Sequence, residues 1–293
     1  MDLNKPVLLV TKKTFYERYG LDLKNRHFIS RMQGDPGIRE QLHKEYEENL
    51  EAIAHVERFI RGQGVAIEMD SGVECLSRSD IPVDDRFSLV VSLGGDGTLL
   101  AASHMVGKAP VVGINSRPGK SVGYFCKASM DDFPSVLEEV FSGRFQPASL
   151  MRMDVLVNGQ RMRPPALNDV LYSAVNPAAT TVNLLSFEGH EEVQKSAGIW
   201  VSTPAGSTGG IASGGGDPMD VGSHQMQLLV REPYRAKNLE YKLDHLFFKE
   251  GCGITNLTPE AAVYVDGARI VHPLVYGDIV QPVVSATPLS IYL

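Results

Sequence analysis

One segment limits the fold of this chain more than any other. Residues 87–93 read Phe-Ser-Leu-Val-Val-Ser-Leu, so an extended strand here would carry apolar side chains on both faces. Strands of this kind belong in the middle of a parallel sheet that helices cover on both sides. A glycine-rich turn follows at residues 94–97, and a helical run begins directly after it at Thr98. The segment therefore predicts a strand, a turn and a helix within an α/β domain.

The first half of the chain continues this alternation of strands and helices. Short apolar runs that predict three more buried strands lie at 6–10, 65–69 and 110–114. Apolar residues three or four positions apart predict an amphipathic helix over residues 37–62. Residues 12–35 are polar and follow no regular period, so we expect irregular structure there. Together these features predict a doubly wound, Rossmann-like α/β domain over residues 1–145.

The pattern changes near residue 146. Residues 153–157 read Met-Asp-Val-Leu-Val and are followed by Asn158-Gly159, which predicts a β-hairpin with a tight turn. Further short runs that read as strands lie at 170–174, 180–187, 199–202, 225–230 and 262–265. Trp200, within one of these runs, is interpreted as a core residue. The second half, residues 146–293, is therefore expected to be a β-rich domain with few helices.

The composition narrows the kinds of protein that this chain can be. Its 28 Lys and Arg residues against 35 Asp and Glu residues give a net charge of −7. That balance argues against a nucleic-acid-binding surface over the whole molecule, although it leaves room for a local phosphate pocket. No apolar run reaches the roughly 18 residues of a membrane span, and residues 1–5 resemble neither a secretion nor an import signal. We therefore expect no nucleic-acid and no membrane partner.

The cysteines and histidines add a second limit. Cys75, Cys126 and Cys252 are far apart and odd in number, which excludes a disulfide framework and a paired-cysteine metal site. The eight histidines show no metal-ligand spacing. We therefore expect free thiols in a cytoplasmic protein, and no metal site built from the protein's own side chains alone.

The strongest local motif is Gly94-Gly95-Asp96-Gly97-Thr98, between the buried strand and its helix. Ligands of open α/β sheets bind at the carboxyl ends of the strands, where glycines and a helix N-terminus suit a phosphate. Asp96 would then lie beside the phosphate, placed to take a proton from an acceptor hydroxyl or to bind a magnesium ion. The alternative is a structural turn in which Asp96 only caps the helix. Lys12 and Lys13 are weaker candidates, either for phosphate binding or as a solvated charge pair.

Four later segments extend this motif into a family resemblance. In order along the chain they are Val111–Asn115 with Val122–Phe125, Ala166–Asp169, Val201–Thr208 and Val265–Gly267. With Gly94–Thr98 they resemble the NAD kinase family, in a superfamily that also holds 6-phosphofructokinases and diacylglycerol and sphingosine kinases. The likeness runs across about residues 90–270. Segments that resemble the mitochondrial and plant-type branch are Thr11–Glu17, Gln194–Gly198 and Arg231–Pro233.

The resemblance implies an activity and a set of site residues. The family transfers the γ-phosphate of ATP, or sometimes of polyphosphate, to the adenosine 2′-hydroxyl of NAD, and magnesium accompanies the ATP. By resemblance Asp96 is the catalytic base, and Gly94, Gly95, Gly97 and Thr98 bind the phosphates. The residues implied for NAD binding are Leu100, Tyr124, Asn168, Asp169, Ser207, Thr208 and Gly209. The family likeness also implies a homodimer or homotetramer.

The chain departs from the family pattern at three positions. Asp169 stands where glutamate is usual, Ala197 replaces a usual aspartate, and Gly210 replaces a usual tyrosine. Two rival hypotheses stay open beside the NAD kinase, and the changes at Ala197 and Gly210 motivate the second of them. One is a lipid kinase of the diacylglycerol type, which shares the glycine-rich motif. The other is a non-catalytic NAD(P)-binding sensor that has kept the pocket and lost turnover.

Overall fold

The computed structural model describes residues 4–70, 85–235 and 240–293, and it consists of two compact units. Among these residues the first unit holds those before 71, residues 85–148 and residues 290–293. The second unit holds residues 149–289. Cys75 lies outside the described residues, whereas Cys126 and Cys252 are free thiols. No helix in the described ranges is long and apolar enough to cross a membrane.

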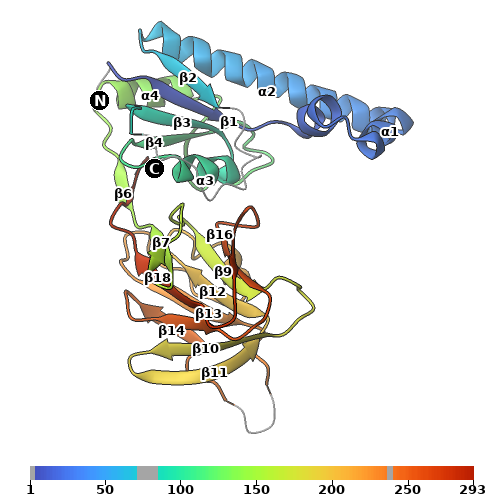
Figure 1. Ribbon diagram of the computed structural model, residues 1–293. Helices are drawn as coiled ribbons and strands as arrows, with labels where there is room; N and C mark the ends of the chain where they lie inside the picture. The colour runs from blue at the N-terminus through green and yellow to red at the C-terminus, as the bar shows by residue number, and fades with distance from the viewer. Residues whose placement is uncertain (1–3, 71–84, 236–239) are drawn as a thin grey trace. The chain divides into compact units, whose positions relative to one another are not determined.

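The first unit is built on a sheet of seven strands in the part of the chain that the structure describes (Figure 1). The strands are β1 (Val7–Thr11), β2 (Ile67–Asp70), β3 (Leu89–Gly94), β4 (Val111–Asn115), β5 (Cys126–Ser129), β6 (Ala148–Leu150) and β19 (Leu289–Tyr292). Their order is β2-β1-β3-β4-β19-β6, with β5 also paired to β4. The pairs from β2 to β19 are parallel, and β3 is buried along its whole length.

Helices cover both faces of this sheet. They are α2 (Pro36–Gly62), α3 (Asp96–His104) and α4 (Phe133–Phe141), while η1 (Tyr16–Asp22) and α1 (Arg26–Gly34) pack against α2. Val56 of α2 and Leu137 of α4 share one core with Val91 of β3. On the other face Leu99 of α3 packs so closely on Gly113 of β4 that a Cβ there would lie 2.7 Å from it. The doubly wound α/β fold predicted for this half is confirmed.

The prediction of irregular structure over residues 12–35 is wrong. These residues form η1 and α1. Figure 1 shows both helices beside the N-terminal part of α2. The ring of Tyr16 lies 5.3 Å from that of Tyr46 on α2, and Tyr19 lies 5.7 Å from Phe28. These aromatic contacts stabilise a π-helical turn, which has no 3.6-residue period for the sequence to display.

The second unit is β-rich, as the sequence predicts. Its strands are β7 (Met153–Val157), β8 (Gln160–Arg161), β9 (Asp169–Ala174), β10 (Thr181–Phe187), β11 (His190–Ser196), β12 (Gly198–Ser202), β13 (Met226–Arg231), β14 (His245–Phe248), β15 (Gly253–Asn256), β16 (Ala261–Val265), β17 (Ile270–Leu274) and β18 (Ile279–Val284), with one short helix, α5 (Gly210–Ser213). They form two antiparallel sheets, ordered β11-β10-β15-β18-β7-β8 and β14-β13-β12-β9-β16-β17. One apolar core joins the two sheets.

The predicted hairpin at Asn158-Gly159 is present. The two residues have φ angles of 52° and 79°, the left-handed values that a tight primed turn requires. The sequence places the last strand, β19, in the expected β-rich domain of residues 146–293. This strand pairs in parallel with β4, where Ile291 lies opposite Val111. Only the tertiary structure shows that the end of the chain completes the first sheet.

Candidate functional site

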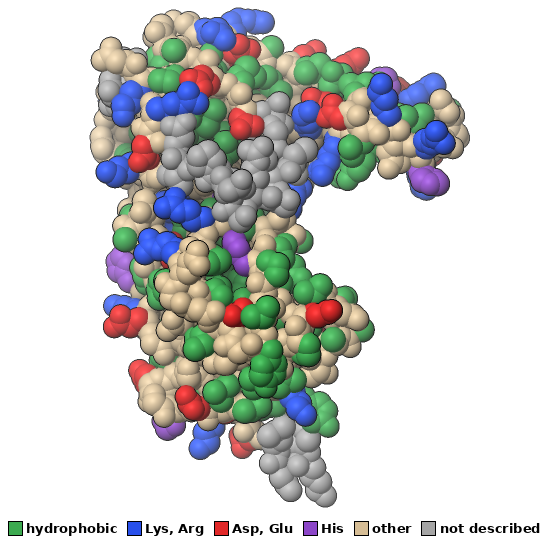
Figure 2. All heavy atoms as spheres, viewed as in Figure 1, with side chains coloured by type: hydrophobic (Ala, Val, Ile, Leu, Met, Phe, Trp, Pro, Cys, Tyr) green, Lys and Arg blue, Asp and Glu red, His purple; other side chains and the backbone are tan. Residues whose placement is uncertain are grey.

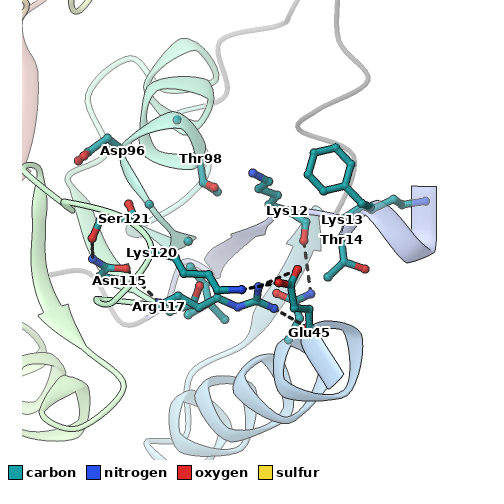
Figure 3. Close-up of a pocket in the computed structure, with 17 residues that line it drawn as sticks. Lys12, Lys13, Thr14, Glu45, Asp96, Thr98, Asn115, Arg117, Lys120 and Ser121 are labelled. Carbon is teal, nitrogen blue, oxygen red and sulfur yellow. Dashed lines mark hydrogen bonds and ion pairs between the residues drawn. The ribbon is translucent and has the colours of Figure 1, made fainter. Parts of the chain in front are cut away.

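A cavity of about 360 Å³ opens at the carboxyl ends of β1, β3 and β4 in the first unit (Figure 3). Its lining comes from the turns after these strands and from α2: Lys12–Phe15, Glu45, Asn49, Leu93–Thr98, Asn115–Arg117, Lys120 and Ser121. Parallel strands place their carboxyl ends at one edge of the sheet, which is where ligands of α/β folds bind. The cavity therefore joins the glycine-rich motif to Lys12 and Lys13, the lysine pair that the sequence left undecided.

Two of the motif glycines are required by packing. A Cβ on Gly95 would lie 2.1 Å from Oγ of Ser121, and one on Gly94 would lie 2.3 Å from Oγ1 of Thr98. Gly97 differs, because it is exposed and a Cβ there would meet nothing within 4 Å. Packing therefore explains two of the glycines, while the third leaves open space where a ligand can approach the backbone.

Asp96 begins α3, and its carboxylate is not used as a helix cap. The N-cap residue is Gly95, and Oδ1 of Asp96 accepts a hydrogen bond of 2.9 Å from the backbone N–H of Phe125. The side chain is half-exposed at the cavity wall. Thr98 is buried, and its hydroxyl has no hydrogen-bond partner among the residues described. The structural-turn alternative therefore does not account for the orientation of Asp96.

Charged side chains of both signs line the opposite side of the cavity. Lys12, Lys13, Arg117 and Lys120 are the four cationic residues of its described lining, and Glu45 lies among them. The ammonium of Lys13 forms an ion pair with Asp22 at 2.6 Å and points away from the cavity (Figure 3). Figure 3 shows Asp96 on one side of this space and the group around Glu45 on the other. Over the described surface in Figure 2, basic and acidic side chains are interspersed. The cation-lined cavity is thus a local feature on an acidic protein.

Asn168 and Asp169, two of the residues implied for NAD binding, are held by the carboxylate of Asp266. Asp266 accepts hydrogen bonds from the backbone N–H groups of Leu167 (2.8 Å), Asn168 (2.8 Å) and Asp169 (3.0 Å). The N–H of Asp266 in turn donates to the carbonyl of Asp169 at 2.9 Å. Asp266 has a φ of 47°, in the left-handed region. The late Asp-Gly segment therefore positions Asn168 and Asp169.

The loop after β12 lies against these same residues. A Cβ on Gly206 would lie 2.1 Å from the carbonyl oxygen of Asn168, so only glycine allows this approach. Gly209 and Gly210 both lie beside the Asp169 carboxylate, since a Cβ on either would be 3.7 Å from its Oδ2. The structure therefore brings Asn168, Asp169 and Gly209 together within the second unit.

The remaining implied residues differ in how accessible they are. Ser207 is fully buried, and its hydroxyl donates to the carbonyl of Pro204 and accepts from the N–H of Met219, both at 2.8 Å. Thr208 is exposed. In the first unit, Tyr124 is 55% exposed and packs edge-on against Phe125, while Leu100 is half-buried on α3. The Ser207 hydroxyl therefore stabilises its own loop, whereas Thr208 and Tyr124 are open to solvent.

Asp169 is an unusual carboxylic acid. Burial, together with the neighbouring charge of Asp266, raises the pKa of Asp169 from its ordinary 3.8 to about 7. The unfolded chain therefore releases this proton near pH 4, whereas the folded protein keeps it up to about pH 7. A raised carboxyl pKa contributes stability at low pH that is lost as the pH rises through that window.

We expect Asp169→Asn to remove this loss of stability. The stability of the variant minus that of the wild type should increase from pH 4 to pH 7, by about 4 kcal/mol at most, and then level off. Urea unfolding across this pH range measures the difference. Glu191→Gln, at an exposed position of β11, is the matched control. A difference that does not change with pH would contradict the prediction.

Sequence interpretation missed a second cavity, in the second unit. It has a volume of about 420 Å³ and is lined by Trp200, Ala197, Tyr264 and Arg231 among others. Trp200 is half-exposed rather than in the core, and a Cβ on Gly210 would lie 3.3 Å from its ring. The guanidinium of Arg231 lies 5.9 Å from the ring centroid. The pair Gly209-Gly210 could have indicated this cavity from the sequence, because residues without side chains leave a neighbouring ring uncovered.

The chain has relatives of known identity. Residues 30–145 match the family model for the ATP-NAD kinase N-terminal domain. The "Probable NADH kinase" of Oryza sativa subsp. japonica is 34% identical over 246 residues, which cover 74% of this chain and 75% of that protein. The "NADH kinase" of Arabidopsis thaliana is 30% identical over 245 residues, covering 74% and 77%. These names support the NAD kinase interpretation, and its plant-type branch, over the lipid kinase.

Solved structures share the fold. An NAD kinase from Archaeoglobus fulgidus in complex with ATP has a TM-score of 0.66 at 19% identity, covering 98% of this chain and 93% of that one. Yeast NADH kinase complexed with NADH has a TM-score of 0.65 at 18% identity, covering 98% and 83%. The fold, the family model and the plant relatives agree. This chain belongs to the NAD kinase family.

Proposed function

We propose that this protein transfers the γ-phosphate of ATP to the adenosine 2′-hydroxyl of NAD or NADH. The observation that carries the proposal is the cavity of the first unit, where Gly94–Thr98 lines the same space as the cationic side chains of Lys12, Arg117 and Lys120. Phosphoryl transfer requires a protein to position its substrates and to stabilise negative charge, and this cavity offers both a phosphate-binding turn and cations. The names of the plant relatives support NAD or NADH as the acceptor.

In this mechanism Asp96 is the general base. The 2′-oxygen forms a bond to the γ-phosphorus while the bond from that phosphorus to the β–γ bridging oxygen breaks, and ADP leaves. The hydroxyl proton passes to the Asp96 carboxylate, whose orientation is held by the N–H of Phe125. The backbone of Gly94–Gly97 and the N-terminus of α3 supply N–H groups for the phosphates.

We also propose that ATP is bound with magnesium. No group of three or more His, Cys, Asp or Glu side chains that could hold a metal exists among the described residues. Magnesium ordinarily takes one or two protein oxygens together with substrate phosphates. With Asp96 acting as the base, the unpartnered hydroxyl of Thr98 is the protein oxygen of the cavity lining that would contact the ion. The ion would supply positive charge to stabilise the transferring phosphoryl group.

On the acceptor side, we propose that Asn168 and Asp169 bind the adenosine part of the dinucleotide. The Asp266 contacts hold their backbone, and the Asp169 carboxylate lies beside the side-chain-free Gly209-Gly210. A carboxylate next to a ribose can accept hydrogen bonds from its hydroxyls. The shorter Asp169 therefore can fill the role of the usual glutamate without a change in the fold.

The lack of a carboxylate at Ala197 predicts that NADH is accepted. Ala197 is half-buried and lines the second cavity, where the family commonly has aspartate. Oxidised nicotinamide is positively charged, so a nearby carboxylate would favour it over the neutral reduced ring. We expect the wild type to use NADH within about tenfold of its rate with NAD, and Ala197→Asp to shift the ratio toward NAD.

Rates with both dinucleotides under the same conditions test this expectation. Val193→Asp adds the same charge at an exposed strand position outside the cavity and serves as the control. Strong exclusion of NADH by the wild type, or an unchanged ratio in Ala197→Asp, would show that another residue distinguishes the two nicotinamides.

The central experiment is an assay of the purified protein. It is incubated with magnesium, either NAD or NADH, and either ATP or polyphosphate, and the 2′-phosphorylated dinucleotide is measured. Product formation is expected. Binding of NAD without product would support the sensor hypothesis, and phosphorylation of diacylglycerol in a parallel reaction would support the lipid kinase.

We further propose a homodimer or homotetramer located in the cytoplasm. Apolar side chains that the second unit leaves exposed support self-association, among them Val175, Val275 and Tyr276. The free thiols of Cys126 and Cys252 fit a reducing compartment. Sedimentation analysis of the purified protein and localisation of a tagged full chain test these two points.

A further inference from the structure

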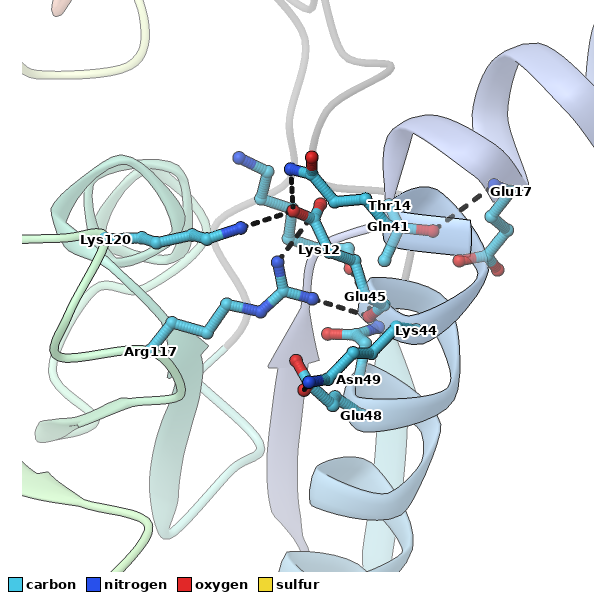
Figure 4. Close-up of polar contacts among 10 residues, drawn as sticks. All are labelled: Lys12, Thr14, Glu17, Gln41, Lys44, Glu45, Glu48, Asn49, Arg117 and Lys120. Carbon is cyan, nitrogen blue, oxygen red and sulfur yellow. Dashed lines mark hydrogen bonds and ion pairs between the residues drawn. The ribbon is translucent and has the colours of Figure 1, made fainter. Parts of the chain in front are cut away.

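One carboxylate lies inside the cation-lined cavity of the first unit. Glu45, on α2, forms an ion pair with Arg117 at 3.2 Å and another, shorter one with Lys120 (Figure 4). Its Oε1 also accepts a hydrogen bond of 3.2 Å from Gln41. The Glu45 side chain is only 17% exposed. An acidic group at this place repels the polyanion that the surrounding cations attract.

Glu45 does not relieve this repulsion by taking up a proton. The hydrogen bonds from Lys120, Gln41 and Arg117 outweigh the effect of burial and lower the pKa of Glu45 to about 2. The carboxylate is therefore charged at any pH at which the protein works. An incoming phosphate must compete with it for its partners.

The two cations are held to Glu45 in different ways. Arg117 also donates from its second terminal nitrogen to the backbone carbonyl of Glu45 at 2.5 Å, a contact that does not depend on the carboxylate. The Lys120 side chain is 58% exposed and is joined to Glu45 through the carboxylate alone. Lys120 can therefore exchange the carboxylate for another anion, while Arg117 stays anchored to α2.

We propose that the Glu45 carboxylate occupies the place on Lys120 that a phosphate of the donor takes on binding. This competition sets the donor's affinity. In the free protein Glu45 keeps Lys120 and Arg117 at the cavity. Phosphate oxygens of the donor replace the carboxylate on Lys120, and the exchange makes donor binding weaker than the cations alone would allow. The group recognised is a triphosphate, whether in a nucleotide or as inorganic tripolyphosphate. The inference rests on the proposed function, because it takes this cavity to be the donor site.

Calorimetric titration with inorganic tripolyphosphate and with ATP tests the proposal directly. Glu45→Gln keeps the shape and the hydrogen-bonding oxygen but removes the charge. It should bind both ligands about two- to fivefold more tightly, as expected for the loss of a partly exposed competing ion pair. The gain should shrink at high salt, which screens the charges. Glu48→Gln, on the same helix but outside the cavity lining, should leave both affinities unchanged.

A second variant separates competition from a purely structural effect. In a Lys120→Gln background, Glu45→Gln should change the affinity little, because the cation for which the carboxylate competes is gone. Weaker or unchanged binding by Glu45→Gln would overturn the proposal, and so would tighter binding of ATP alone. Tripolyphosphate binding requires no turnover. If the protein has no kinase activity but Glu45→Gln binds tripolyphosphate more tightly, only the proposed kinase activity is contradicted. If the protein is an active kinase but Glu45→Gln does not bind more tightly, only this inference is contradicted.

Discussion

Asp96→Asn is expected to lower kcat by about 10²- to 10⁴-fold, the usual contribution of a general base. The amide oxygen of asparagine can still accept the hydrogen bond from the Phe125 N–H, which in the wild type is 2.9 Å long. The cavity and its phosphate contacts should therefore persist, and the KM for ATP should change little. Steady-state kinetics and a titration with ATP measure the two effects separately.

Two comparisons make the Asp96 result specific. Asp131→Asn, at an exposed position of the same unit, should retain wild-type activity. Asp96→Ala should lose the turnover and the Phe125 contact together, so that it is also less stable than Asp96→Asn. If Asp96→Asn keeps more than about a tenth of the wild-type rate, Asp96 is not the base.

Asp266→Ala is expected to destabilise the second unit by about 3–5 kcal/mol, because three backbone N–H groups lose a charged acceptor together. The new residue would also have to adopt a φ of 47°, which alanine disfavours. Urea unfolding followed by the fluorescence of Trp200, the chain's only tryptophan, measures the loss. Dinucleotide use should fall as well, since the backbone of Asn168 and Asp169 loses its support.

Asp266→Asn is the graded counterpart of this variant. Its amide oxygen can replace Oδ1, which accepts from Asn168 and Asp169, but its NH₂ group cannot accept from Leu167. We therefore expect a smaller loss of stability than for Asp266→Ala. Loss of the Asp266 charge should also lower the pKa of Asp169 from about 7. Equal stability of the wild type and Asp266→Ala would show that these contacts contribute nothing to folding.

The sequence was informative wherever the signal is local. The run before Gly94 predicts a fully buried strand because apolar side chains occupy both of its faces, and β3 is buried throughout. Asn158-Gly159 predicts its hairpin because these residues adopt positive φ at little cost. The ordered motifs also led to the family that the plant relatives support.

Asp266 shows that local sequence signals do not reveal contacts between residues that are far apart in the chain. The motif placed Asp266 in a late turn, but its role became visible only when the fold brought it to Asn168, 98 positions away. Likewise, the undecided pair Lys12 and Lys13 joins the glycine-rich turn in one cavity because β1 and β3 are neighbours in the sheet.

The sequence by itself therefore determined the α/β and β-rich halves and the glycine-rich turn, because periodicity and turn chemistry act over a few residues, and it proposed Asp96 as the base. Only the tertiary structure decided the helices η1 and α1, the return of β19 to the first sheet, and the place of Glu45 between Arg117 and Lys120. Glu45 and Lys120 are 75 positions apart. Contacts over such separations follow from strand order and helix packing, which leave no period in the sequence.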